Sequence, residues 1–325
     1  MLADLVALVM LGALVAYTVT GGADFGGGVW DLLASGPRKE AQRALIAKAI
    51  APIWEANHVW LILLVVVMFG ALPTAFSALM TALHIPLVLV LVGVVLRGAA
   101  FVFRTYDPKR GGGAERWRLV FAIASVVTPL ALGVSLGALV SGGIHLDSHD
   151  GIDFTQTSFT SSWATPFALG TGVFTVVLLA YLAAVYLTVE AEERALQDDF
   201  RVRALVAGVA SAIVAHGLLF AGLGPRGGWG IVVEVVVALC GASALWLLWT
   251  RRYRVARIMA AAQVAGVVVG LGLAQYPYVI PPDLTFARAL APDTVVEAML
   301  IALAVGVPIL FAALVWLYRV FKEAP

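Results

Sequence analysis

The chain has 325 residues, of which 62% are hydrophobic and 13% charged, and its formal net charge is +1. Ordinary soluble domains are about 45–50% apolar and about 25% charged, so this composition excludes a typical soluble enzyme. The small net charge gives no electrostatic reason to propose a nucleic-acid partner. With a single cysteine, Cys240, the chain can form neither a disulfide framework nor a thiolate metal site.

Nine apolar segments follow one another, each about as long as the roughly 20 residues that an α-helix needs to cross a bilayer. They lack the alternating pattern of barrel strands, and the first is too long for a cleavable signal peptide. The sequence therefore predicts an all-α, polytopic integral membrane protein, with residues 1–325 forming a single membrane domain. We expect two four-helix bundles, from spans one to four and five to eight, plus one additional helix. The predicted spans are 5–33, 49–72, 78–103, 117–141, 163–188, 203–222, 230–249, 256–275 and 295–319.

Basic residues gather in alternate connections between these spans, and the intervening connections are poor in them. The acidic cluster Asp147, Asp150 and Asp153 lies in one of the basic-poor connections. Positively charged loops stay on the cytoplasmic side, so the N-terminus is predicted outside and the C-terminus inside. The basic residues that support this are Arg38, Lys39, Arg43, Lys48, Arg104, Lys109, Arg110, Arg116, Arg118, Arg194, Arg201, Arg203, Arg251, Arg252, Arg254, Arg257, Arg319 and Lys322.

The first span contains a carboxylate, Asp24, inside a glycine-rich stretch at residues 21–28. An acid at the centre of a membrane helix costs roughly 2.5–3.5 kcal/mol on insertion scales, so it normally faces the protein interior and has a function. The glycines by themselves are equally well explained as a helix-packing seam. With the predicted orientation, Asp24 lies in the inner half of its span.

The second span begins with an acid and an imidazole three residues apart, Glu55 and His58, which can share one helix face. A carboxylate beside an imidazole is a plausible proton relay. A purely structural hydrogen bond between the two groups is the alternative, and from these residues alone it is the more frequent outcome. Two further intramembrane histidines, His84 and His216, lie at matching outer depth and would allow a haem to be ligated between them. No paired spacing on one helix supports that, and a packing role is the simpler interpretation.

Arg97 and Arg104 close the third span on one helix face. The deeper of the two, Arg97, is predicted to form a structural ion pair with Asp24 or Glu55, and a role as a topology anchor at the interface is the alternative. At the outer end of the eighth span, residues 275–282 combine tyrosines typical of an aromatic belt with helix-terminating prolines.

These segments, taken in order, resemble subunit II of cytochrome bd quinol oxidases. The resemblance rests on residues 22–26 (Gly-Ala-Asp-Phe-Gly), 50–61 (Ile-Ala-Pro-Ile-Trp-Glu-Ala-Asn-His-Val-Trp-Leu), 97–104 (Arg-Gly-Ala-Ala-Phe-Val-Phe-Arg) and 276–281 (Tyr-Pro-Tyr-Val-Ile-Pro). Two departures stand out, because many family members carry an acid in place of Gly21 and a glycine in place of Ala56. Relatives also include oxidases called cyanide-insensitive, and the sequence does not separate those labels.

The resemblance implies that haem b and haem d are ligated by a partner, the haem-bearing subunit I, which also holds the quinol site. No catalytic, cofactor-binding or metal-ligating residue is then expected in this chain. Asp24 and Glu55 match family acids associated with a cytoplasmic proton path, which His58 would extend, and Trp60 matches a tryptophan linked to oxygen access. A small single-span subunit, membrane lipid and quinone are further expected partners, and a bacterial cytoplasmic membrane is the expected location.

Two other functions remain open from the sequence. A proton- or cation-coupled secondary transporter would need a midplane site, commonly at broken helices, whereas these acids cluster near one face. A purely structural subunit would use its acids only to pair with Arg97.

Overall fold

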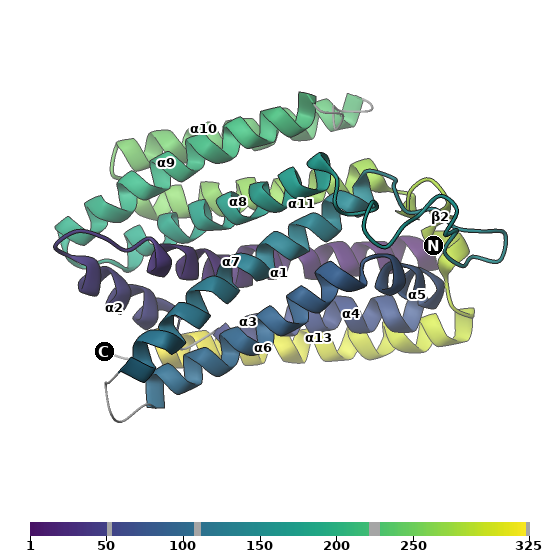
Figure 1. Ribbon diagram of the computed structural model, residues 1–325, viewed down its shortest axis with the longest axis horizontal. Helices are drawn as coiled ribbons and strands as arrows, with labels where there is room; N and C mark the ends of the chain where they lie inside the picture. Colours follow the sequence, from purple (N-terminus) through teal and green to yellow (C-terminus); the bar gives the residue numbers. More distant parts are fainter. Residues whose placement is uncertain (51–53, 107–111, 221–227, 323–325) are drawn as a thin grey trace.

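The computed structural model describes residues 1–50, 54–106, 112–220 and 228–322 (Figure 1). These residues are almost entirely helical, with one small antiparallel pair of strands near the end of the chain. The elements are α1 (Leu2–Leu32), α2 (Lys39–Ile50), α3 (Trp54–Asn57), α4 (Val59–Ala71), α5 (Pro73–Ala82), α6 (His84–Tyr106), α7 (Gly112–Val140), α8 (Pro166–Glu190), α9 (Arg194–Leu218), α10 (Gly228–Trp249), α11 (Tyr253–Gln275), β1 (Tyr278–Ile280), β2 (Leu284–Thr285), α12 (Phe286–Ala289) and α13 (Asp293–Lys322).

Within the described residues, nine helical segments are long and apolar enough to cross a membrane, which confirms the predicted fold class. They are α1, the α3–α4 pair, α6, α7, α8, α9, α10, α11 and α13. Three boundaries differ from the sequence expectation. The third span begins at His84, because α5 ends at Ala82 and forms a short helix of its own. The second is interrupted at His58, between α3 and α4, and the sixth begins in the charged stretch at Arg194.

The first helix lies at the centre of the molecule and packs against α4, α7, α8 and α11. Helices α9 and α10 form one edge of the bundle and α13 the opposite edge, where it packs mainly against α4 (Figure 1). The two termini lie at opposite ends, as an odd number of spans requires. The division into two four-helix bundles stays a prediction, since α1 and α7 also pack directly on α8.

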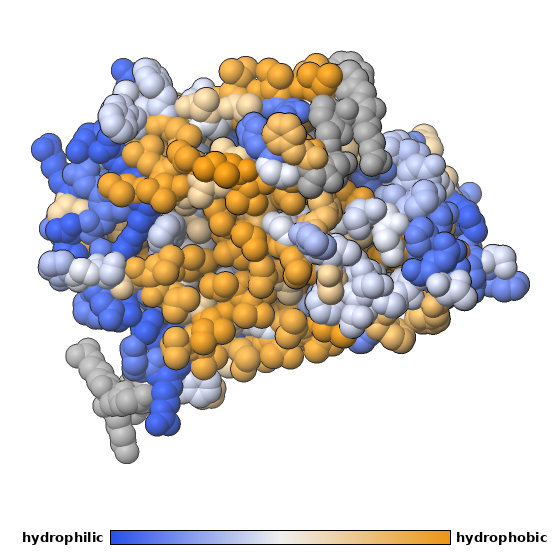
Figure 2. Space-filling view, turned by 45° about the horizontal axis from the view of Figure 1, so that its top comes forward, coloured by the Kyte–Doolittle hydropathy of each residue, from blue (hydrophilic) through white to orange (hydrophobic). Residues whose placement is uncertain are grey.

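On the face shown in Figure 2, apolar side chains cover the middle of the molecule, and polar side chains gather at both ends. The end that carries the C-terminus also carries α2 and the start of α9 (Figure 1), and there Arg38 binds Asp199 through two hydrogen bonds of 2.9 and 2.5 Å. That carboxylate raises the pKa of Arg38. The opposite end carries the loop of residues 142–162, in which Leu146 and Ile152 form an isolated bridge, and the β1–β2 pair.

Glycines on α1 allow its close approach to two neighbouring helices. An ideal Cβ on Gly26 would lie 2.0 Å from the carbonyl oxygen of Leu179 on α8, and one on Gly28 would lie 2.2 Å from the Cβ of Ser125 on α7. No side chain fits at such distances, so the glycine stretch is a packing seam, as one interpretation of the sequence held. This seam holds Asp24 deep inside the bundle.

Candidate functional site

The predicted acid of the first span is buried at the centre of the molecule. Asp24 on α1 is only 5% exposed, and its Oδ2 accepts a hydrogen bond of 2.6 Å from Nδ2 of Asn57 on α3. The same amide nitrogen lies 3.5 Å from the carbonyl oxygen of Thr20, one turn earlier on α1. A buried carboxylate needs such donors, because desolvation without a hydrogen bond is costly. Asp24 and Asn57 therefore form one buried polar unit.

His58 occupies the break between α3 and α4 and turns toward α1. Its Nδ1 lies 3.4 Å from the hydroxyl of Tyr17, and its ring packs edge-on against Phe25 and Trp54. The backbone N–H of His58 donates to the carbonyl oxygen of Glu55 at 3.2 Å. The imidazole is thus half-buried among aromatic rings of α1 and α3, and in the chain it directly follows Asn57 of the Asp24 unit.

Arg97 places a guanidinium against the same region from α6. It is 1% exposed, its Nε donates to Oγ of Ser125 on α7 at 3.2 Å, and its Cζ lies 4.8 Å from the ring centroid of Phe25 and 5.1 Å from that of Phe121. Such cation–π contacts are favourable, the more so when the cation is desolvated. Among the described residues, neither Nη atom of Arg97 has a hydrogen-bond partner. A buried cation therefore lies close to the Asp24 and His58 region.

The remaining predicted residues are more dispersed. Glu55 is exposed on the outer surface of α3, so the structure places it apart from the buried groups. Trp60 is half-buried on α4 and lines the cavity described next. Arg104 belongs to α6, but its side chain lies outside the described part of the structure, as do residues 51–53 of the second predicted segment and Lys109 and Arg110.

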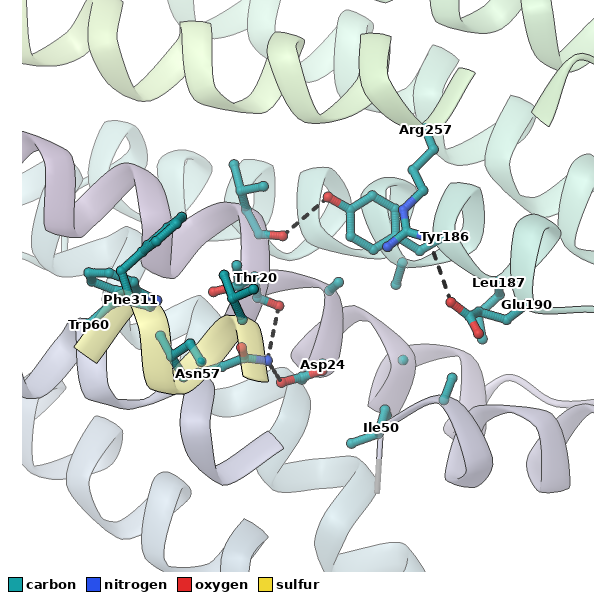
Figure 3. Close-up of a pocket in the computed structure, with 17 residues that line it drawn as sticks. Thr20, Asp24, Ile50, Asn57, Trp60, Tyr186, Leu187, Glu190, Arg257 and Phe311 are labelled. Atoms are coloured by element: carbon teal, nitrogen blue, oxygen red, sulfur yellow. Dashed lines mark hydrogen bonds and ion pairs between the residues drawn. The ribbon is translucent and has the colours of Figure 1, made fainter. Parts of the chain in front are cut away.

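A cavity of about 340 Å³ opens between α1, α2, α3–α4, α8, α11 and α13 (Figure 3). Asp24 and Asn57 lie on one wall, and Tyr186, Glu190 and Arg257 lie on another. The rest of the lining is largely apolar and includes Trp60, Ile50, Leu187, Phe311, Leu314 and Val315. This arrangement, a buried carboxylate facing a partly polar cavity, suits the binding and transfer of protons rather than bond-making chemistry.

Haem iron is held by His, Met, Cys or Tyr, and of these residue types only tyrosine, as Tyr186, is among the described residues that line the cavity. His84 and His216 are exposed, and the Nδ1 of each lies within hydrogen-bond distance of a carbonyl oxygen in the preceding turn, of Thr81 at 2.9 Å and of Ala212 at 2.7 Å. Among the described residues, no group of three or more His, Cys, Asp or Glu side chains is placed to hold a metal ion.

Comparison with known proteins identifies the chain. The family described as "Cytochrome bd terminal oxidase subunit II" matches residues 2–321. This chain belongs to that family. The resemblance read from the sequence is thereby confirmed.

Relatives in this family are bacterial. "Cytochrome bd ubiquinol oxidase subunit 2" of Bacillus subtilis is 26% identical over 93% of this chain and 90% of its own length. "Cytochrome bd-I ubiquinol oxidase subunit 2" of Escherichia coli K12 is 30% identical over 54% of this chain and 45% of its own length, so this chain spans about half of it. A chain in the structure of bd oxidase from Geobacillus thermodenitrificans superposes with a TM-score of 0.75 and 21% identity over the full length of both chains, which shows the shared fold.

Several residues of the subunit II site were not singled out from the sequence. Asn57 lies inside the predicted second segment, yet an amide next to a histidine gives no sign of which helix it will face. Tyr17 is seven residues before Asp24 on α1, a helical spacing that could have suggested a shared face. Glu190 and Arg257 lie on α8 and α11 and are 3.6 Å apart. These two residues are far apart in the chain and reach the cavity only because α8 packs against α11. No local sequence pattern therefore predicts that they belong to the site.

Proposed function

We propose that this chain is the non-haem-ligating subunit of a bacterial terminal oxidase that oxidises quinol and reduces oxygen to water. Haem b and haem d are assigned to a partner, the haem-bearing subunit I, which also binds the quinol. Support comes from membership of the subunit II family and from the names of the Bacillus subtilis and Escherichia coli relatives.

The main role proposed for this chain is proton uptake from the cytoplasm. Oxygen reduction consumes protons, and a buried redox site needs titratable groups or water that lead to it. The observation that carries this proposal is the buried carboxylate of Asp24, held by Asn57 at 2.6 Å and facing a cavity. Glu55, on the exposed side of α3, and His58, which packs against Tyr17 and Phe25 of α1, complete the proposed path.

A second role is oxygen access along the apolar side of the cavity. Trp60 lines it together with Phe311, Leu314 and Val315, which form an apolar surface suited to a small nonpolar gas. Substituting Trp60 by alanine should widen the route and change the rate of oxygen binding more than the rate of quinol binding. Stopped-flow oxygen binding to the reduced complex measures this difference.

The proposed membrane orientation places the N-terminus outside and the C-terminus inside, in a bacterial cytoplasmic membrane. The charged α2 and the basic residues from Arg251 to Arg257 then face the cytoplasm, and the loop of residues 142–162 faces outward. Cysteine labelling should modify position 150 from outside and position 252 from inside. Labelling of position 150 from the cytoplasm only contradicts this orientation. Lipid, quinone and a small single-span subunit are further proposed partners.

The decisive test uses the assembled two-subunit complex. Glu55→Gln and Asp24→Asn keep size and hydrogen-bonding capacity but cannot exchange a proton at useful pH. We expect both complexes to keep normal haem content while quinol-driven oxygen consumption falls, with the steps that take up protons slowed most. Glu55→Asp should retain part of the activity, since the group stays titratable on a shorter arm.

The matched control is Asp153→Asn, which removes a carboxylate from the opposite end of the molecule and should leave turnover unchanged. A haem-replete Glu55→Gln complex that turns over at the parental rate removes Glu55 from the path and leaves Asp24 as the leading group. If both acids prove dispensable, the proton-uptake role is wrong. A purified chain that carries no haem spectrum with any second subunit, and that moves protons or cations alone, favours the transporter alternative.

A further inference from the structure

The wall of the cavity opposite Asp24 carries its own ionisable pair. Oε1 of Glu190, the last residue of α8, lies 3.6 Å from Nη1 of Arg257, in the second turn of α11. The guanidinium of Arg257 stacks over the ring of Tyr186 at 4.7 Å, and the hydroxyl of Tyr186 donates to the carbonyl oxygen of Val19 on α1 at 3.3 Å. These contacts connect the mouth of the cavity to the helix that carries Asp24 (Figure 3).

The pair lies where the cavity meets the surface. The side chains of Glu190 and Arg257 are 28% and 39% exposed, whereas Asp24 is 5% exposed. Glu190 ends its helix at the end of the molecule that also carries the C-terminus and the basic connections. One carboxylate of the cavity therefore reaches bulk water, and the other lies inside the bundle.

The space between the two carboxylates is large enough for water. A site of about 10–15 Å³ already holds one water molecule if polar partners surround it, and this cavity measures about 340 Å³. Polar groups stand at both ends, with Asp24, Asn57 and Thr20 inside and Glu190 and Arg257 at the mouth. Water molecules that join these groups would form a chain along which protons can move.

We propose that Glu190 is the entry group of a hydrated proton vestibule that leads to Asp24. This inference rests on the proposed function and adds an entrance on the α8–α11 side, away from the exposed Glu55. A proton from cytoplasmic water binds the Glu190 carboxylate, passes to cavity water and reaches Asp24, while a second proton from the cytoplasm restores Glu190. No bond other than O–H forms or breaks, and no electron is transferred.

Arg257 and Tyr186 position the entry group in this arrangement. A separation of 3.6 Å is within the range of an ion pair but longer than a charge-assisted hydrogen bond, which is about 2.7–2.9 Å. The carboxylate is therefore attracted to the mouth without being locked there by Arg257. The aromatic ring under the guanidinium keeps the cation at the wall of the cavity instead of across its opening.

The first experiment compares single substitutions in the assembled oxidase. Glu190→Gln should keep its haem content while proton uptake during oxidation of the reduced complex by oxygen slows by roughly tenfold. That is less than the ~10²–10⁴ typical of a lost acid–base group, because cavity water can bypass it. Glu190→Asp should restore most of the rate. The matched control is Glu192→Gln, two residues away, whose carboxylate pairs with Lys48 on the surface and does not line the cavity.

The two proposals fail in distinguishable ways. If Asp24→Asn slows proton uptake and Glu190→Gln does not, the vestibule is wrong and the role of the subunit stands. If neither substitution slows proton uptake, the proton-uptake role itself fails and the vestibule with it. Equal slowing by Glu190→Gln and Glu192→Gln would assign the effect to general surface charge and overturn the specific role of Glu190.

A second measurement does not depend on assembly of the Glu190 variant. In a Cys240→Ala background, Ala23→Cys places a thiol on the cavity wall beside Asp24, nine residues before the end of α1. Leu239→Cys places one on the exposed face of α10, ten residues before the end of that helix. A charged, membrane-impermeant thiosulfonate added from the cytoplasmic side should label position 23 about tenfold faster, because the reactive thiolate forms only where water reaches it. Labelling of position 23 that is no faster than that of position 239 overturns the hydrated vestibule.

Discussion

The first and last spans, α1 and α13, are nearly equal in length but differ in their surroundings. The first is 31 residues long and packs against four other spans, whereas α13 is 30 residues long and packs mainly against α4. Buried glycines and two buried acids, Asp24 and Asp31, mark the C-terminal half of α1. Much of the apolar middle of α13 is exposed, for example at Ile301, Val305 and Ile309.

This difference separates two uses of an apolar helix in a membrane protein. Lipid tails are as apolar as leucine, so hydrophobicity alone does not decide which helix is inside. Small residues let α1 approach its neighbours, and a polar group inside then has to be satisfied by protein. An apolar helix with bulky side chains and no such seam can stay at the periphery, facing lipid or a partner. The following predictions test this contrast in order of expected effect.

The largest effect is expected from closing the seam on α1. Gly26→Val places a side chain against the backbone carbonyl of Leu179, which cannot rotate away, so the loss should exceed the usual ~1–3 kcal/mol of overpacking. This loss of stability is measured as thermal unfolding, monitored by size-exclusion chromatography. Gly12→Val on the same helix is the control, because nothing lies within 4 Å of a Cβ there. Equal stability of the two variants would contradict the seam.

A smaller loss is expected from breaking the buried polar unit. Asn57→Leu removes the amide that donates a hydrogen bond to Oδ2 of Asp24 and should cost about 1.5–3 kcal/mol, the usual contribution of a hydrogen bond to a charged group. Chemical unfolding in detergent measures the change. In an Asp24→Asn background the same substitution should cost clearly less, because the side chain that accepts the bond is then neutral. If the stability losses of Asn57→Leu and Asp24→Asn simply add in the double variant, the two side chains are not coupled.

The same chemical change on the two helices gives a direct comparison. Val6 on α1 is 0% exposed and Val305 on α13 is 61% exposed. Val6→Ala should cost about 1 kcal/mol because a cavity remains, whereas Val305→Ala should change stability by less than about 0.5 kcal/mol because lipid or detergent refills the space. A larger loss at Val305 in the assembled complex would show that another chain covers this face of α13.

The smallest effect concerns the N-terminal end of α1. Asp4 accepts a hydrogen bond from the hydroxyl of Tyr276, which follows α11, and this bond raises the pKa of Tyr276. A raised pKa means that the interaction is complete below the ordinary tyrosine pKa and is lost as pH rises through the folded value. In difference titrations against Tyr276→Phe, Asp4→Asn should lower the pH at which this phenol ionises. If Asp4→Asn leaves the titration of Tyr276 unchanged, the hydrogen bond between Tyr276 and Asp4 does not form in solution.

Much of the fold follows from sequence alone. Length and hydropathy fixed the class and the approximate position of every span, since a bilayer demands about 20 apolar residues for each crossing whatever the packing. The predicted span boundaries were wrong where one helix ends and another begins inside an apolar stretch, and where a helix continues into charged residues. Hydropathy does not detect a break between two apolar helices, so the predicted third span includes part of α5. The predicted sixth span begins too late, because α9 starts in charged residues that lower the mean hydropathy of that stretch.

The candidate site divides in the same way. An acid in an apolar helix stands out from sequence, so Asp24 and Glu55 could be named. Four segments together indicated the family, and the one around Glu55 is highly specific. Their environments could not be deduced, because burial depends on the rotation of each helix against its neighbours. Only the packing of α3 against α1 buries Asn57 beside Asp24 and leaves Glu55 exposed. Likewise, Glu190 and Arg257 meet only because α8 and α11 pack together, since contact between distant residues is decided by tertiary packing and not by any local period.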